Sequence, residues 1–105
     1  MENPKNIAVI GATGSIGTQT LDIIATHPER YRATVLAAGS RVAELIELAR
    51  RHRPALAVIA DESRHAELRA ALEPLGIATA AGPAALCEAV CRDDVDTVSY
   101  THLRA

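Results

Sequence analysis

A glycine-rich turn at residues 11–17, GATGSIG, directly follows the apolar run at residues 7–10. A pattern with helical periodicity begins at Ser15 and ends near His27, because Pro28 cannot continue a helix. A strand that enters a glycine turn and leaves it as a helix presents free backbone N–H groups and the positive end of a helix dipole. The turn therefore constrains this part of the chain to a βαβ unit suited to a phosphate-containing ligand.

Apolar runs and helical patterns alternate along the rest of the chain. Strands are predicted at residues 6–10, 33–38, 57–60, 77–80 and 95–98. The three later helices are expected after Gly39, after Asp61 as N-cap, and from Pro83 toward Arg92. Five strands separated by four helices predict right-handed crossovers. The expected fold class is α/β: a doubly wound, Rossmann-like parallel sheet of about five strands with helices on both faces, truncated relative to a complete domain.

The composition narrows the function classes. A chain of 105 residues supports one domain, and its 49% hydrophobic and 23% charged residues are ordinary for a globular protein. A net charge of −2 and only two tyrosines argue against a nucleic-acid partner. No segment has the run of about 20 apolar residues that a membrane span needs, and the first five residues lack a secretion signal. We therefore expect a cytoplasmic protein.

Each glycine of the turn has an expected role. Gly11 allows a tight exit from the strand, and Gly14 lets the backbone approach a pyrophosphate. Gly17 is expected on the helix face that packs against the sheet, where a Cβ would push the helix away. Thr13 and Ser15 can add hydroxyl donors to phosphate oxygens. Because the spacing is GxxGxxG and not the commoner GxGxxG, the surrounding strand and helix carry the prediction of a dinucleotide site.

The end of the second strand indicates which dinucleotide is bound. A site for NAD usually has Asp or Glu here to accept hydrogen bonds from the ribose 2′-hydroxyl, whereas an NADP site needs space and positive charge. This chain has no carboxylate at that point: Gly39 offers space, Ser40 a hydroxyl group, and Arg41 a guanidinium suited to a phosphate. The pattern predicts NADPH, although Arg41 could also be a solvated residue at a helix start.

No catalytic or metal-binding residue is predicted. We expect Cys87 and Cys91 to be small buried hydrophobic residues on one helix face, since their spacing is not that of a redox CxxC motif. Helix-terminal and surface positions account for the histidines at 27, 52 and 65, and the aspartates at 93, 94 and 96 are expected in a solvated turn. Glu47 and Arg51 are expected to form an ion pair on the outer face of their helix.

Longer stretches carry a family resemblance. The segments GATGSIGTQTLD at 11–22, HP at 27–28, VLAAG at 35–39, PALAVI at 54–59 and DVDTV at 94–98, together with Tyr31, resemble 1-deoxy-D-xylulose 5-phosphate reductoisomerase. The resemblance implies an NADPH-dependent enzyme that rearranges and reduces 1-deoxy-D-xylulose 5-phosphate to 2-C-methyl-D-erythritol 4-phosphate in isoprenoid biosynthesis. It also implies a divalent metal, Mg²⁺ or Mn²⁺, and a homodimer.

The resemblance assigns residues to the cofactor. It places Thr13, Gly14, Ser15 and Ile16 at the pyrophosphate side of NADPH, and it places Gly39, Ser40 and Arg41 at the adenosine-phosphate side. Many family members have Asn at the position of Arg41. The departure leaves the contacts on the adenosine side open, although a cation there still favours a 2′-phosphate.

The resemblance ends at residue 98. Residues 1–98 are expected to form an incomplete NAD(P)-binding domain, and residues 99–105 a tail outside the family, of foreign origin in a truncated or frame-shifted chain. The metal ligands and the substrate site of the family lie beyond position 105, so no turnover is expected from this chain alone. Two alternatives stay open: a free-standing NADP-binding sensor or regulatory module, recognisable by an ordered tail, and the nucleotide domain of another NADP-dependent dehydrogenase or epimerase.

Overall fold

The strands of this protein form one parallel sheet. In the computed structural model, residues 4–92 and 95–100 are described. The strands are β1 (Lys5–Ile10), β2 (Tyr31–Ala38), β3 (Leu56–Ile59), β4 (Ala78–Ala81) and β5 (Thr97–Tyr100). Their order across the sheet is β4-β3-β2-β1-β5, and all neighbouring pairs are parallel. The prediction of a Rossmann-like parallel sheet of about five strands is confirmed.

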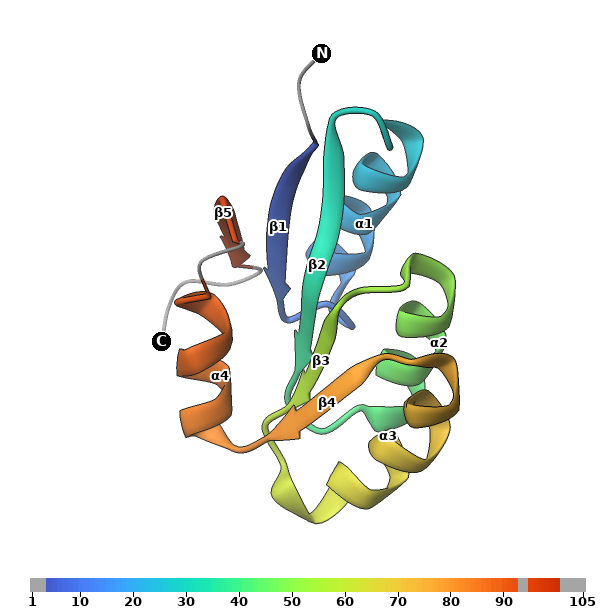
Figure 1. The fold of residues 1–105 in the computed structure, drawn as a ribbon, viewed down its shortest axis with the longest axis vertical. Helices are drawn as coiled ribbons and strands as arrows, with labels where there is room; N and C mark the ends of the chain where they lie inside the picture. Colours follow the sequence, from blue (N-terminus) through green and yellow to red (C-terminus); the bar gives the residue numbers. More distant parts are fainter. Residues whose placement is uncertain (1–3, 93–94, 101–105) are drawn as a thin grey trace.

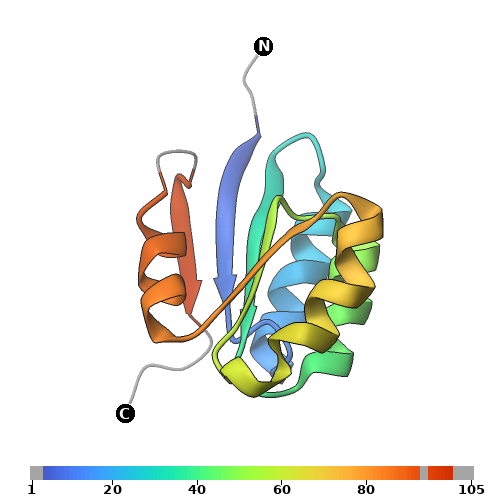
Figure 2. The same ribbon diagram turned by 60° about the horizontal axis from the view of Figure 1, so that its bottom comes forward.

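The helices divide between the two faces of the sheet. Helices α1 (Ser15–Thr26), α2 (Val42–His52) and α3 (His65–Leu72) lie on one face, and α4 (Pro83–Val90) lies on the other (Figures 1 and 2). Two short 3₁₀ segments, Glu62–Arg64 and Glu73–Leu75, flank α3. Within the described residues, none of the helices has the length and apolarity that crossing a bilayer would require.

Helical spacing places the buried residues on the inner faces of the helices. Leu21 of α1, Leu45 of α2, and Leu68 and Leu72 of α3 are all completely buried and join one core cluster with Leu36 of β2. Each buried leucine contributes about 2 kcal/mol through the apolar surface it removes from water. A second cluster, on the opposite face, packs Ala89 of α4 on the central strands.

The central strand β2 is buried on both faces. Its residues 33–38 are all at most 6% exposed, as expected of a strand covered by helices on both sides. A register shift falls between Ile7 and Ala8 of β1, so that Ala33 and Val35 of β2 face consecutive residues of β1. The bulge leaves Thr34 without a partner residue in that pairing, and its side chain is buried.

The chain reverses its direction across the sheet at β1. From β1 the strands progress outward to β4, after which α4 crosses the opposite face and the chain returns to pair β5 with the free edge of β1 (Figure 1). In sheets of this kind, ligands bind outside the carboxyl ends of the strands at the point of reversal. That point is the end of β1 at Ile10, directly before the glycine turn.

Strand β5 differs from the prediction for residues 95–98. It begins at Thr97, because Val95 packs against the cluster beneath α4 and Asp96 exchanges hydrogen bonds with the start of β1. The N–H of Asp96 donates to the carbonyl oxygen of Asn6 at 2.8 Å, and the N–H of Asn6 donates to the Asp96 carboxylate at 2.8 Å. The predicted strand began two residues too early because Val95, an apolar residue of the preceding loop, was assigned to it.

Candidate nucleotide-binding site

The glycine turn is fixed to the end of the neighbouring strand. The backbone N–H groups of Gly11 and Ala12 both donate to the carbonyl oxygen of Ala37, at 2.9 and 2.8 Å. Gly11 has a φ of 76°, in the left-handed region where a residue with a Cβ is strained. The expected tight exit from β1 is therefore present, and it depends on glycine at this position.

Gly17 is required by the turn itself and not by the sheet. A Cβ on Gly17 would overlap the carbonyl oxygen of Gly11 and would lie 2.8 Å from the Cα of Ala12. The sequence correctly indicated a position without room for a side chain, but the neighbour that excludes it is the backbone of the turn. The first turn of α1 thus folds back onto the residues that precede it.

Gly14 is under less constraint than the other two glycines. It is the N-cap of α1 with a φ of −78°, and a Cβ there would lie at an ordinary 3.5 Å from the carbonyl oxygen of Gly11. The fold without ligand therefore does not need glycine here. Its expected role in the approach of a pyrophosphate stays a prediction.

The amino end of α1 is open to an anion. Among the described residues, no side chain caps this helix, and its first turn contains no acidic residue. The first N–H groups of a helix have no partner within the helix and carry partial positive charge. Ser15 is exposed, and Ile16 is 53% exposed beside it, an uncommon state for a large apolar side chain. This end can donate several hydrogen bonds to phosphate oxygens.

The end of β2 lies next to the turn, because β1 and β2 are paired up to Ile10 and Ala37. Gly39 has no atom within 4 Å of the position that a Cβ would take, so the expected space is there. Ser40 and Arg41 are exposed on the segment that leads into α2. The structure thus brings the two predicted groups, residues 11–17 and 39–41, to the same edge of the sheet.

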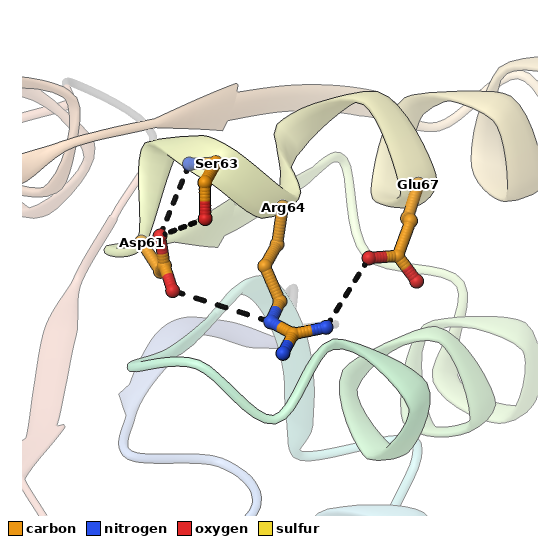
Figure 3. A network of polar contacts seen from close by, with 4 residues as sticks. All are labelled: Asp61, Ser63, Arg64 and Glu67. Atoms are coloured by element: carbon orange, nitrogen blue, oxygen red, sulfur yellow. Dashed lines mark hydrogen bonds and ion pairs between the residues drawn. The ribbon is translucent and has the colours of Figure 1, made fainter.

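The segment after β3 supports Gly39. The backbone N–H of Asp61 donates to the carbonyl oxygen of Gly39 at 2.9 Å. Asp61 also accepts hydrogen bonds from the backbone N–H of Ser63 at 3.0 Å and from its hydroxyl at 2.6 Å (Figure 3). These two hydrogen bonds hold the pKa of Asp61 below its ordinary value. The bond from the hydroxyl has the larger effect and the bond from the backbone N–H the smaller one, and the charge of Arg64 lowers the pKa further.

Arg64 extends this arrangement to the next turn. Its Nε lies 4.0 Å from the Asp61 carboxylate, and its Nη1 lies 3.3 Å from the Glu67 carboxylate (Figure 3). All three side chains are substantially exposed, so each ion pair contributes little stability by itself. The predicted N-cap at Asp61 is confirmed, although the helix it opens is first a 3₁₀ turn and becomes α3 only at His65.

A cavity beside the turn contains residues that sequence reasoning did not assign to the site. Its volume is about 230 Å³, and it is lined by Thr13, Thr18, Glu44, Glu47, Leu48 and Arg51. The four residues from α2 lie at positions i, i+3, i+4 and i+7 of the helix, so they share one helix face. That spacing could have been found in the sequence, but not the fact that this face meets the glycine turn.

Ion pairing on α2 also differs from the expectation. Glu47 and Arg51 form no ion pair within 4.0 Å, although both line the cavity. The pair that α2 does make joins Arg41 and Glu44, with 3.9 Å between the guanidinium Nη1 and the carboxylate Oε2. The side chains are 66% and 54% exposed, respectively. The cation predicted for a 2′-phosphate thus has a carboxylate as its neighbour.

A larger cavity, of about 490 Å³, lies at the opposite end of the sheet. It is lined by residues at the starts of β1 and β2 and at the ends of α1 and α2, among them His52. Helix carboxyl ends carry partial negative charge, which disfavours a phosphate. Burial and, secondly, the nearby Arg51 lower the pKa of His52, while Asp22 opposes them. The glycine turn therefore remains the candidate site despite its smaller cavity.

The remaining candidate residues do not form a second site. Cys87 and Cys91 are both free and exposed, so the prediction of a buried pair is wrong: α4 covers the sheet through Ala89 and turns the cysteines outward. The described residues contain no group of three or more side chains suited to a metal ion. Asp93 and Asp94 lie outside the described residues.

Comparison with known proteins agrees with this geometry. The family model of 1-deoxy-D-xylulose 5-phosphate reductoisomerase matches residues 7–102. The reductoisomerase of Xanthomonas axonopodis pv. citri is 53% identical over 98 residues, 91% of this chain and 25% of its own length. That of Pseudomonas putida KT2440 is 46% identical over 100 residues, 93% of this chain and 25% of its own.

Solved structures resemble the chain in fold as well as in sequence. The enzyme of Zymomonas mobilis in complex with NADPH has a TM-score of 0.80 and 42% identity, covering 84% of this chain and 23% of its own. A reductoisomerase complex with NADPH, fosmidomycin and magnesium has a TM-score of 0.82 and 35% identity, covering 90% and 23%.

The chain thus spans about a quarter of the length of the relatives it matches. The match nevertheless includes the glycine turn, the end of β2 and nearly all of the sheet. Together, the family match over most of its residues, the identity to curated relatives and the shared fold place this chain in the 1-deoxy-D-xylulose 5-phosphate reductoisomerase family.

Proposed function

We propose that this chain binds NADPH at the edge of the sheet formed by the glycine turn and the end of β2. The pyrophosphate would lie at the amino end of α1, against the backbone of Gly11, Gly14 and Gly17 and the side chains of Thr13, Ser15 and Ile16. The observation that carries the proposal is the uncapped amino end of α1, without a carboxylate in its first turn, at the point where the chain reverses across the sheet.

The preference for NADPH over NADH would come from the segment at residues 39–41. Gly39 leaves open space, Ser40 offers a hydroxyl donor, and Arg41 provides a guanidinium suited to a 2′-phosphate. An arginine gains a charge-assisted hydrogen bond only when the 2′-phosphate is present. The same residue should therefore have little effect on the binding of NADH.

We further propose that the chain is the nucleotide-binding part of an enzyme that converts 1-deoxy-D-xylulose 5-phosphate to 2-C-methyl-D-erythritol 4-phosphate. Such an enzyme would take a small-molecule substrate and Mg²⁺ or Mn²⁺, and would be a cytoplasmic homodimer. Since the chain spans only about a quarter of the length of its relatives, these 105 residues alone would bind cofactor without turnover in this proposal. The domain of this proposal comprises the predicted residues 1–98 together with Ser99 and Tyr100, which pair with Val9 and Ile10 of β1 at the end of β5.

Calorimetric titration of the purified chain with NADPH and with NADH tests the cofactor assignment. We expect tighter binding of NADPH, and we expect Arg41→Ala to weaken NADPH about tenfold, the loss of one charge-assisted hydrogen bond. The affinity for NADH should change less than about twofold, because NADH has no 2′-phosphate and does not form that hydrogen bond with Arg41. Arg50→Ala, an exposed arginine farther along the same helix, is the matched control. Equal affinity of the unmodified chain for both cofactors would refute the role of Arg41.

A second measurement addresses turnover. The chain is mixed with NADPH, Mg²⁺ and 1-deoxy-D-xylulose 5-phosphate, and the absorbance of NADPH is followed. No oxidation that depends on the substrate is expected, because hydride transfer needs a substrate held against the nicotinamide. Measurable oxidation by the 105-residue chain would contradict the proposal that it only binds cofactor.

A further inference from the structure

The carboxylate of Glu44 forms an ion pair with Arg41. Its Oε2 lies 3.9 Å from the Arg41 Nη1, and both groups are more than half exposed. A pair of this length and exposure holds its partners weakly. Arg41 is therefore free to turn toward an incoming phosphate, while the negative charge of Glu44 stays close to the place where that phosphate would bind.

Glu44 also faces the glycine turn. It lines the same cavity as Thr13, together with Glu47 and Arg51 from the following turns of α2. The charged groups on this cavity are thus two carboxylates and one guanidinium. A phosphate held by Arg41 beside this wall would meet more negative than positive charge from the residues of α2 that line the cavity.

A carboxylate in this region is the feature that sites for NAD use. There it accepts hydrogen bonds from the ribose 2′-hydroxyl, and it repels a 2′-phosphate. The sequence has no carboxylate at the end of β2, but the first turn of α2 places one, Glu44, close to that end. The site therefore combines a cation typical of NADP sites with an anion typical of NAD sites.

We propose that Glu44 is a specificity-determining residue that limits the preference of this site for NADPH over NADH. The proposal rests on the cofactor site described under the proposed function. Glu44 repels the 2′-phosphate directly, and it also competes with the phosphate for the guanidinium of Arg41. In NADH, which has a 2′-hydroxyl at that position, neither effect operates.

Charge removal at Glu44 tests the proposal. Glu44→Gln keeps the size of the side chain and an acceptor oxygen, so NADH should bind within about twofold of the unmodified chain, as expected when an acceptor is conserved. The ratio of the NADH to the NADPH dissociation constant should rise about threefold at low salt and return toward the original ratio in about 0.5 M salt, since exposed charges are screened. Glu44→Lys should raise the ratio further, by about tenfold at low salt.

Glu47→Gln is the matched control. It removes the same charge from the same cavity wall one helical turn farther from Arg41, and should change the ratio by less than about 1.5-fold because the interaction falls with distance and screening. An equal effect of Glu47→Gln would overturn the assignment to Glu44, as would a loss of NADPH affinity in Glu44→Gln. If the unmodified chain binds neither cofactor, the proposed function fails; if both bind with an unchanged ratio, only the role of Glu44 fails.

Discussion

Gly17 packs directly on the carbonyl group of Gly11, so the first turn of α1 is in close contact with the glycine turn that precedes it. The contact joins the first and last glycines of the motif. It leaves no volume for a methyl group, whereas the middle glycine, Gly14, has ordinary space around it. The three glycines are therefore not equivalent in the folded chain.

Gly17→Ala should destabilise the protein by about 2 kcal/mol or more. The added Cβ forces the turn away from α1, and the better helix propensity of alanine offsets only about 1 kcal/mol of that cost. Gly14→Ala should cost about 1 kcal/mol or less, the loss of a favourable N-cap residue. Urea denaturation of both variants measures the difference. If Gly14→Ala proved the more damaging change, the contact between Gly17 and Gly11 would not control the turn.

The fold could be predicted from the sequence because the hydrophobic periodicity and the glycine and proline residues at the ends of elements indicated the same boundaries. The apolar run of β2 is buried on both faces, as are Ala8 and Val9 of β1, and the helix starts at Ser15 and Pro83 follow a glycine in each case. The prediction failed at β5, where Val95 packs as a loop residue, and at the cysteines of α4. Whether a short helix turns one face or another to the sheet depends on packing that eight residues do not specify.

For the candidate site, local sequence was sufficient for the turn but not for its surroundings. Gly11 and Arg41 could be selected because strand ends and glycine turns have known geometry. Glu44 lies three residues after Arg41, but the contact of its side of α2 with the glycine turn follows from packing and not from local sequence. Its exposed position on a helix gave no reason to separate it from an ordinary surface charge.

Thr34→Val should stabilise the protein by about 1 kcal/mol. Thr34 lies in the bulge of β2 and is 4% exposed, and its hydroxyl oxygen has no hydrogen-bond partner among the described residues. Valine has the same shape and no polar atom to desolvate, so the substitution removes a cost without creating a cavity. Thermal or urea unfolding measures the change, with Thr34→Ala as the control that does leave a cavity. A destabilised valine variant would mean that the hydroxyl is hydrogen-bonded in solution.

The stability of the protein should fall as the pH drops below about 6.5, the ordinary pKa of histidine. Burial lowers the pKa of His52 in the folded chain, with Arg51 as the second cause. The unfolded chain therefore takes up this proton at a higher pH than the folded chain, and protonation favours unfolding. His52 supports the fold fully above the unfolded pKa, and this support is lost as the pH falls through 6.5 toward the lower folded value.

Urea midpoints measured at several pH values test this dependence. His52→Gln should flatten the decline in stability on the acid side. His27→Gln, at the end of α1, removes a histidine from another helix terminus and serves as the matched control. An unchanged pH dependence in His52→Gln would show that other groups are responsible.

Ser63→Ala should raise the pKa of Asp61 toward its ordinary value. The serine hydroxyl is the principal cause of the lowered pKa, ahead of the serine backbone N–H and Arg64. The alanine variant keeps the backbone bond, so part of the shift should persist. Titration of the Asp61 carboxyl carbon by NMR measures both values. Glu67→Gln, which removes the partner of Arg64 and leaves Ser63 in place, should have the smaller effect.

The pairing of β1 with β5 also determines when the second edge of β1 can be covered. The backbone N–H of Asn6 is bound by the carboxylate of Asp96, 90 positions later. At a synthesis rate of about 5–20 residues per second, roughly 5 to 20 s separate the two partners on the ribosome. During that time β1 has one edge without a neighbour, directly beside the glycine turn. While this edge is unpaired, the nascent chain is exposed to wrong strand pairing, so the synthesis of β5 sets how long the edge of β1 stays vulnerable.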